Sequence, residues 1–224
     1  MPIGNREASV RFDTSLRALI RRFFARTGYA CLLGLSIPII GIIFDVILLP
    51  NRDLMFYVGN AAGVLALVVI LNTLGIGIVT FTSTSTKTAR PPLWVLPVSF
   101  ALLAGLLLAV FSVIGLTTVY SNSFIAFIVG AISGAAAGLA YALSIPGIRQ
   151  DTILQQLRHS LIIGGVIGIL VALYFFIKTM PADASGVILV KHAINTFVAV
   201  PITIVGLLLS FVLGIELGDR YVER

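Results

Sequence analysis

Three polar side chains lie inside long apolar stretches of the chain, where polar groups are rare. Asp45 is the only acid placed within such a stretch, and Asn72 and Thr73 lie deeper in the next one. Polar and ionisable residues inside a membrane are costly, and those that occur commonly serve ion, proton or substrate pathways. The sequence therefore indicates Asp45, Asn72 and Thr73 as the candidate functional residues.

Each candidate also has a purely structural interpretation. Asp45 is five residues before Pro50, close enough to the membrane surface to reach water. It could also pair with a basic residue of the outer loops: Arg52, Lys178 or Lys191. Asn72 and Thr73 would either hydrogen-bond between helices or line a polar path. Because the middle of the bilayer then holds no charge, the pattern argues against a proton- or ion-coupled carrier.

The residues that bind cofactors and metals are too few and too scattered for a site. His159 and His192 fall at opposite membrane edges and cannot share a haem. Cys31 is the only cysteine, which excludes an intramolecular disulfide and a cysteine-based metal site. We expect no cofactor, no metal and no enzymatic activity.

Ser133 and His192 form the one pair that resembles a known catalytic site. The pair is similar to the serine–histidine dyad of rhomboid proteases, which also have a six-span core. The local sequence from Gly130 to Gly134, GAISG, departs from the GxSG pattern of that family. The family's long first outer loop is also missing. We interpret Ser133 as a packing serine and His192 as an interfacial histidine.

The segments that carry these residues are long and apolar. Hydrophobic residues make up 58% of the 224 residues and charged residues only 11%, whereas soluble domains carry about a quarter charged residues. A membrane-spanning helix needs roughly 20 apolar residues. Six stretches meet this length: 28–50, 55–80, 93–118, 124–146, 160–178 and 194–215. The sequence predicts an all-α membrane protein, a bundle of six transmembrane helices.

The basic residues predict how this bundle is oriented. With six spans, 12 of the 15 Lys and Arg residues lie on the side of the termini and three on the other. The positive-inside rule places the side rich in Lys and Arg in the cytoplasm. We expect a cytoplasmic arm over 1–27, a membrane domain over 28–216 and a cytoplasmic tail over 217–224, in the plasma membrane. The net charge of +6 is then explained by basic residues at the membrane surface, and no nucleic-acid partner is expected.

The arm before the first span is amphipathic. Apolar residues recur at helical spacing from Phe12 to Phe24, and Arg17, Arg21 and Arg22 lie on the opposite face. This pattern is typical of an interfacial helix on the membrane surface, with its arginines against anionic head groups. The alternative is that the apolar face docks on a partner subunit.

Small residues recur at intervals of four within the spans and predict close helix contacts. Gly130, Gly134 and Gly138 form one stripe, and Gly164 and Gly168 form another. The halves of the chain also share short strings: AAGVLALVVIL from Ala61 with IGGVIGILVAL from Ile163, and GLLLAVF from Gly105 with GLLLSFV from Gly206. They suggest a 3+3 inverted repeat, as in many transporters, or coincidence among common apolar residues.

Two functions fit these features. The first is a membrane-embedded, permease-like transport component that works with partner subunits on an apolar or lipid-like substrate. The second is a non-catalytic structural or accessory subunit of a larger membrane complex, or of a homo-oligomer. The amphipathic arm, the repeat and the uncharged spans favour the first function. The packing glycines favour the second.

Overall fold

The described part of the chain consists of long α-helices. The computed structural model describes residues 15–48, 53–82, 93–114, 122–144, 153–178 and 186–223. The helices are α1 (Leu16–Gly34), α2 (Ser36–Leu48), α3 (Leu54–Thr82), α4 (Val95–Val113), α5 (Ser123–Ser144), α6 (Ile153–Lys178) and α7 (Gly186–Val222).

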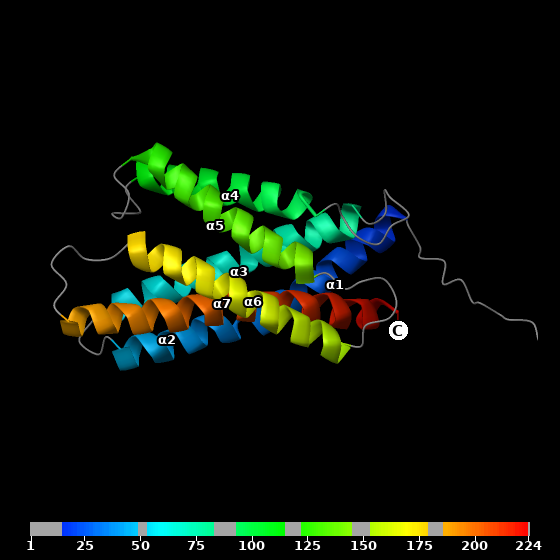
Figure 1. Ribbon diagram of the computed structural model, residues 1–224. Coiled ribbons are helices and arrows are strands. Elements are labelled where there is room, and N and C mark those ends of the chain that lie inside the picture. The colour runs from blue at the N-terminus through cyan, green and yellow to red at the C-terminus, as the bar shows by residue number, and fades with distance from the viewer. Residues whose placement is uncertain are drawn as a thin grey trace, which may run out of the picture.

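Six segments of the described chain are long and apolar enough to cross a membrane, and α1 and α2 together form the first of them. The predicted bundle of six spanning helices is therefore confirmed. The chain is a multi-pass membrane protein. The start of α1 and the end of α7 lie at the same end of the bundle (Figure 1), which we call the terminal end; the opposite end is the far end.

The first span is broken once, between α1 and α2. The break is a single residue, Leu35, whose N–H is hydrogen-bonded to the carbonyl of Cys31 at 3.1 Å. Pro38 follows three residues later and lacks an N–H, and its ring would clash with the carbonyl of Gly34, four residues earlier. The helix therefore ends at Gly34 and restarts with Pro38 in its first turn, where proline is tolerated.

Helix α7 forms the centre of the bundle. It contacts α1, α2, α3, α5 and α6, and Figure 1 shows it in orange and red, running along the length of the bundle. Helices α4 and α5 form a hairpin that joins the other helices mainly through α5. The structure does not show the inverted repeat, because α4 and α7, its predicted counterparts, have different surroundings.

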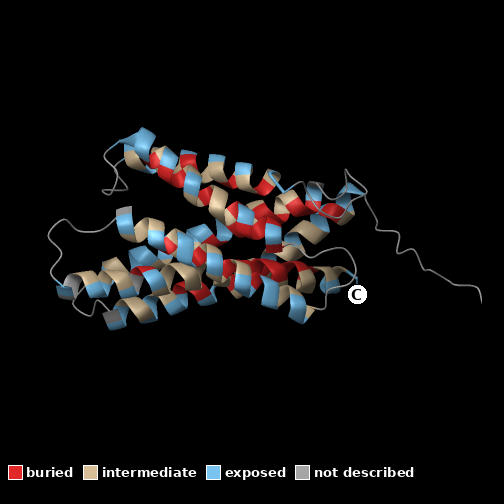
Figure 2. Cartoon of the chain, viewed as in Figure 1, coloured by how far each residue is buried: buried red, intermediate tan, exposed pale blue. Residues whose placement is uncertain are grey.

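The buried side chains gather toward the terminal end of the bundle (Figure 2). Aromatic rings join three helices there: Tyr141 of α5 lies 4.5 Å from Phe211 of α7 and 5.1 Å from Phe100 of α4, between ring centroids. All three rings are almost completely buried. The contact of Tyr141 with Phe211 thus joins the hairpin to α7 in its terminal half, while the contact with Phe100 lies within the hairpin.

The predicted amphipathic arm is only partly described. Residues 1–14 lie outside the described part, and the helix that begins at Leu16 continues without interruption past residue 27, the predicted domain boundary. Leu19 is buried, and the ring of Phe23 lies 5.7 Å from that of Phe81 on α3. Part of the apolar face therefore packs within this chain, because α1 continues directly into the bundle.

The glycine stripe of α5 lies against the backbone of α4. A Cβ at Gly130 would lie 2.5 Å from the carbonyl oxygen of Ala104, and one at Gly138 would lie 2.5 Å from that of Leu96. A Cβ at Gly134 would overlap the carbonyl oxygen of Phe100. The lack of side chains lets the two backbones approach closely.

Glycines of α6 have the same role against α7. A Cβ at Gly168 would lie 2.6 Å from the Cα of Pro201, and one at Gly164 would lie 3.0 Å from a methyl carbon of Leu208. Gly168 therefore accommodates the proline inside α7.

Candidate functional site

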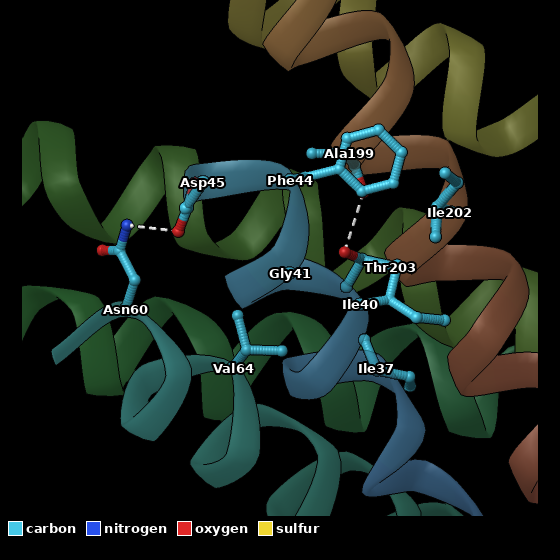
Figure 3. A pocket seen from close by; sticks show the side chains of 10 residues that line it. All are labelled: Ile37, Ile40, Gly41, Phe44, Asp45, Asn60, Val64, Ala199, Ile202 and Thr203. Atoms are coloured by element: carbon cyan, nitrogen blue, oxygen red, sulfur yellow. Dashed lines mark hydrogen bonds between the residues drawn. The ribbon is translucent and has the colours of Figure 1, made fainter. Parts of the chain in front are cut away.

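Two neighbouring cavities lie between the first span and α7. The smaller, which we call the chamber, has a volume of about 180 Å³ and is lined by α2, α3 and α7. Figure 3 shows the side chains that line it: Ile37, Ile40, Gly41, Phe44, Asp45, Asn60, Val64, Ala199, Ile202 and Thr203. The chamber thus combines an apolar wall with three polar side chains.

The polar side of the chamber is built around Asp45. Asn60 of α3 donates a hydrogen bond from Nδ2 to Oδ2 of Asp45, with a distance of 3.1 Å (Figure 3). The hydroxyl of Thr203 donates to the carbonyl oxygen of Ala199, one turn earlier in α7, at 2.8 Å. Within the described residues, no cationic side chain lies within ion-pair distance of Asp45. The predicted partners Arg52 and the Lys178 side chain lie outside the described part.

The larger cavity, which we call the groove, has a volume of about 480 Å³. It runs between the break of the first span and the middle of α7, and its lining is almost entirely apolar: Leu33, Ser36, Ile37, Ile40, Pro201, Ile202, Val205, Gly206, Leu209, Ser210 and Leu213. The chamber and the groove share Ile37, Ile40 and Ile202 as lining residues. The two cavities are therefore adjacent, one with polar groups and one without.

Prolines on both sides account for the position of the groove. Leu33 and Ser36 flank the break that Pro38 imposes, and Pro201 lies in the opposite wall. A proline inside a helix leaves one backbone carbonyl without its usual hydrogen bond and deforms the local packing. The groove therefore lies where both of its walls depart from regular helical hydrogen bonding, at the break of the first span and at Pro201 within α7.

Asn72 lies outside both cavities, at the centre of a buried hydrogen-bond network. Its side chain is fully buried. Asn72 Nδ2 donates to Ser210 Oγ of α7 at 3.0 Å, and the hydroxyl of Tyr141 of α5 donates to Asn72 Oδ1 at 2.9 Å. Of the two predicted roles for Asn72, the structure shows the hydrogen bonds between helices. Ser210 also lines the groove, so the network reaches the groove wall.

Replacing Asn72 with alanine is expected to lower the free energy of unfolding by about 2 kcal/mol. It breaks three interhelical hydrogen bonds, those with Ser210, Tyr141 and the carbonyl of Ala30 on α1, and leaves the Tyr141 hydroxyl buried without its acceptor. The measurement is SDS titration of the purified protein in mild detergent. Asn60→Ala is the comparison, since it breaks a single exposed hydrogen bond, the one from α3 to Asp45, and should cost less, about 0.5 to 1 kcal/mol. Equal losses for the two variants would contradict the role of the network.

Thr73 lies apart from both cavities and contacts the first span. Its side chain lies close to that of Cys31 on α1. Among the described residues, the three predicted candidates are therefore not brought together: Asp45 lies in the chamber, Asn72 in the network and Thr73 against Cys31.

Sequence reasoning missed an ion pair at the terminal end. Arg26 of α1 binds Asp219 of α7 through Nε to Oδ1 at 2.7 Å and Nη2 to Oδ2 at 2.8 Å. Arg26 Nη1 also donates to Thr80 Oγ1 of α3 at 2.9 Å. The prediction counted Arg26 only among the basic residues that orient the chain. The sequence signal that could have indicated this ion pair was Asp219, an acidic residue only four positions after the last predicted span.

The remaining predicted polar residues are dispersed. Arg17 and Arg21 are exposed at the terminal end, and Arg22 is half-buried. Ser133 Oγ is buried without a hydrogen-bond partner in the described part of the chain, and the ring of His192 stacks on Phe176 at 5.5 Å. The dyad that the resemblance to rhomboid proteases implies is therefore not formed.

Comparisons with protein-family models, curated proteins and solved structures found no match to this chain. Within the described residues, no group of three or more His, Cys, Asp or Glu side chains could hold a metal ion. The chamber and the groove are therefore the features on which a functional assignment rests.

Proposed function

We propose that this protein is a membrane-embedded, permease-like transport component that works with partner subunits on an apolar or lipid-like substrate. The observation that carries the proposal is the groove of about 480 Å³ beside the chamber. A cavity with an apolar lining at the level of the membrane interior suits an apolar chain, because few polar groups of the lining have to lose water when such a chain binds. The adjacent polar chamber suits the polar end of the same molecule.

The position of the groove supports a route from the lipid phase. Among its lining residues, Leu33 and Pro201 are half-buried and Ser36 is exposed. An apolar molecule that is already dissolved in the bilayer could therefore enter from the side, without crossing water. The break at Leu35 and the proline in α7 are also points at which helices of transporters commonly bend.

The distribution of charge supports the proposed orientation. The first turns of α1, the start of α6 and the end of α7 all lie at the terminal end and carry Arg17, Arg21, Arg158 and Arg220. By the positive-inside rule this end faces the cytoplasm of a plasma-membrane protein, where arginines can contact anionic lipid and partner subunits can dock.

Filling the groove tests the proposal. Ser36→Trp places a large ring in the groove at an exposed position of α2. The protein, with any subunits that co-purify in mild detergent, is reconstituted into vesicles that contain a fluorescent single-chain lipid. Movement of the lipid between leaflets is followed by chemical quenching from outside. We expect Ser36→Trp to slow this movement about tenfold, the effect of losing about 1.4 kcal/mol of binding.

Leu170→Trp is the matched control, because Leu170 is an exposed residue of α6 outside the groove lining. It should move lipid at the wild-type rate. The proposal fails if wild-type vesicles are no faster than protein-free vesicles, or if both tryptophan variants behave alike.

A second candidate function is supported by the glycine contacts. The backbones of α4 and α5 touch along Gly130, Gly134 and Gly138, as expected of a rigid packing unit. A structural or accessory subunit of a membrane complex would need such rigidity and no substrate cavity. It predicts that groove-filling variants assemble normally with their partners and leave every activity of the complex unchanged.

A further inference from the structure

We propose that the substrate is a single-chain amphiphile with an ammonium head group, held with its ammonium against Asp45 and its chain along the groove. This inference rests on the proposed function, because it names the substrate class of the same cavities. Asp45 and Asn60 lie at one side of the chamber, while Ile37, Ile40 and Ile202 lead from the chamber to the groove (Figure 3).

The carboxylate of Asp45 favours a ligand with a cationic head group. Asp45 is the one ionisable side chain among the described lining residues of the chamber, and an ionised carboxylate only accepts hydrogen bonds. The described residues that line the chamber and the groove include no Lys, Arg or His. A carboxylate or phosphate head group would therefore meet like charge without compensation, whereas an ammonium would form a charge-assisted hydrogen bond.

The hydrogen-bonding groups of the chamber also suit a donor. Asn60 uses Nδ2 to donate to Asp45, which leaves its amide oxygen as an acceptor. Thr203 uses its hydroxyl hydrogen to donate to Ala199, which leaves its oxygen lone pairs as acceptors. An ammonium carries three N–H donors and no acceptor. The chamber thus presents acceptors from three side chains to a head group that has only donors.

The adjacent groove favours a ligand that has a single apolar chain and no phosphate group. Its lining is apolar except for Ser36 and Ser210, whose hydroxyls donate to the carbonyls of Leu33 and Leu207. An aminophospholipid would place a phosphate between its ammonium and its chains, next to Ile37 and Ile40. Burying that anion without a cationic partner is costly. A long-chain amine without phosphate avoids the cost.

Binding of four probes to the protein in mild non-ionic detergent tests this inference. The probes are tetradecylamine, tetradecanol, tetradecanoate and phosphatidylethanolamine, and the readouts are the shift in unfolding temperature and direct titration. We expect the amine to bind about tenfold more tightly than the other three, as for a partly exposed, charge-assisted hydrogen bond. Asp45→Asn should abolish that preference, so that the amine binds no more tightly than tetradecanol.

Two further variants test the inference even if Asp45→Asn does not fold. Thr203→Val removes one acceptor at nearly constant volume and should weaken amine binding alone, by a few-fold. Gly41→Leu should weaken binding of all single-chain probes, because Gly41 lines the chamber and the leucine side chain takes up space there. The fold should tolerate this change, since an added Cβ meets no atom within 4 Å. Gly165→Leu is its matched control on α6, where an added Cβ also meets nothing within 4 Å; it should bind like the wild type.

The outcomes separate this inference from the function on which it rests. If the three single-chain probes bind equally and Gly41→Leu weakens all of them, the ammonium preference is wrong while a lipid-like substrate stands. Tighter binding of phosphatidylethanolamine than of the amine would overturn the single-chain assignment. If none of the probes binds, both the inference and the proposed substrate class are overturned.

Discussion

Replacing Gly134 with valine is expected to lower the free energy of unfolding by about 3 kcal/mol, at the upper end of the usual cost of overpacking. The added Cβ would overlap the carbonyl oxygen of Phe100 and would lie 2.8 Å from the Cβ of Ala104. Because the obstacle is backbone, no side-chain rotation can relieve it, and α4 must move away from α5. SDS titration in mild detergent measures the loss.

Gly63→Val is the matched control for this prediction. Gly63 lies in the middle of α3, and an added Cβ meets no atom within 4 Å there. The control should therefore change the free energy of unfolding by less than about 0.5 kcal/mol. If Gly134→Val were equally harmless, the close contact between α4 and α5 would be wrong.

The second large effect is expected for Arg26→Ala, which should cost about 2 to 3 kcal/mol. Removing one partner of a buried ion pair costs about 3–5 kcal/mol, because the remaining charge is left buried and unpaired. The side chains of Arg26 and Asp219 are 13% and 31% exposed, so water reduces the cost. Arg26→Lys should restore only part of the loss, since lysine cannot form the two parallel hydrogen bonds.

Arg220→Ala provides the comparison at the same end of the bundle. It breaks the ion pair of Arg220 with Glu216, one turn apart in α7, whose side chains are 62% and 35% exposed. Exposed pairs of this kind contribute less than about 0.5 kcal/mol. The same SDS titration applies to both variants. A loss for Arg26→Ala as small as for Arg220→Ala would show that Arg26 does not tie α1 to α7.

The Arg26–Asp219 ion pair and the Asn72 network join different sets of helices. The ion pair, together with Gly218 against the backbone of Arg26, joins α1 to α7 at the terminal end. The Asn72 network joins α1, α3, α5 and α7 near the aromatic core. The chamber lies beyond them, where Asp45 near the end of α2 meets Asn60 near the start of α3.

Composition and charge alone were enough to predict the class of the protein. A chain with 58% hydrophobic and 11% charged residues must place its apolar surface in lipid. The polar breaks between the apolar runs then determined six spans, which the structure confirms. The spacing of Gly130, Gly134 and Gly138 is equally local information, because residues four apart share one helix face.

The partner of each residue was decided only by the tertiary structure. Arg26 and Asp219 are 193 positions apart, and Asn72 and Ser210 are 138 apart. No periodicity links such residues; they meet because α7 packs at the centre of the bundle. The same holds for the cavities, since a proline can be read from the sequence but the space beside it depends on which helix lies opposite. Composition and helical period therefore determined which segments span the membrane, and packing between helices determined where a ligand could bind.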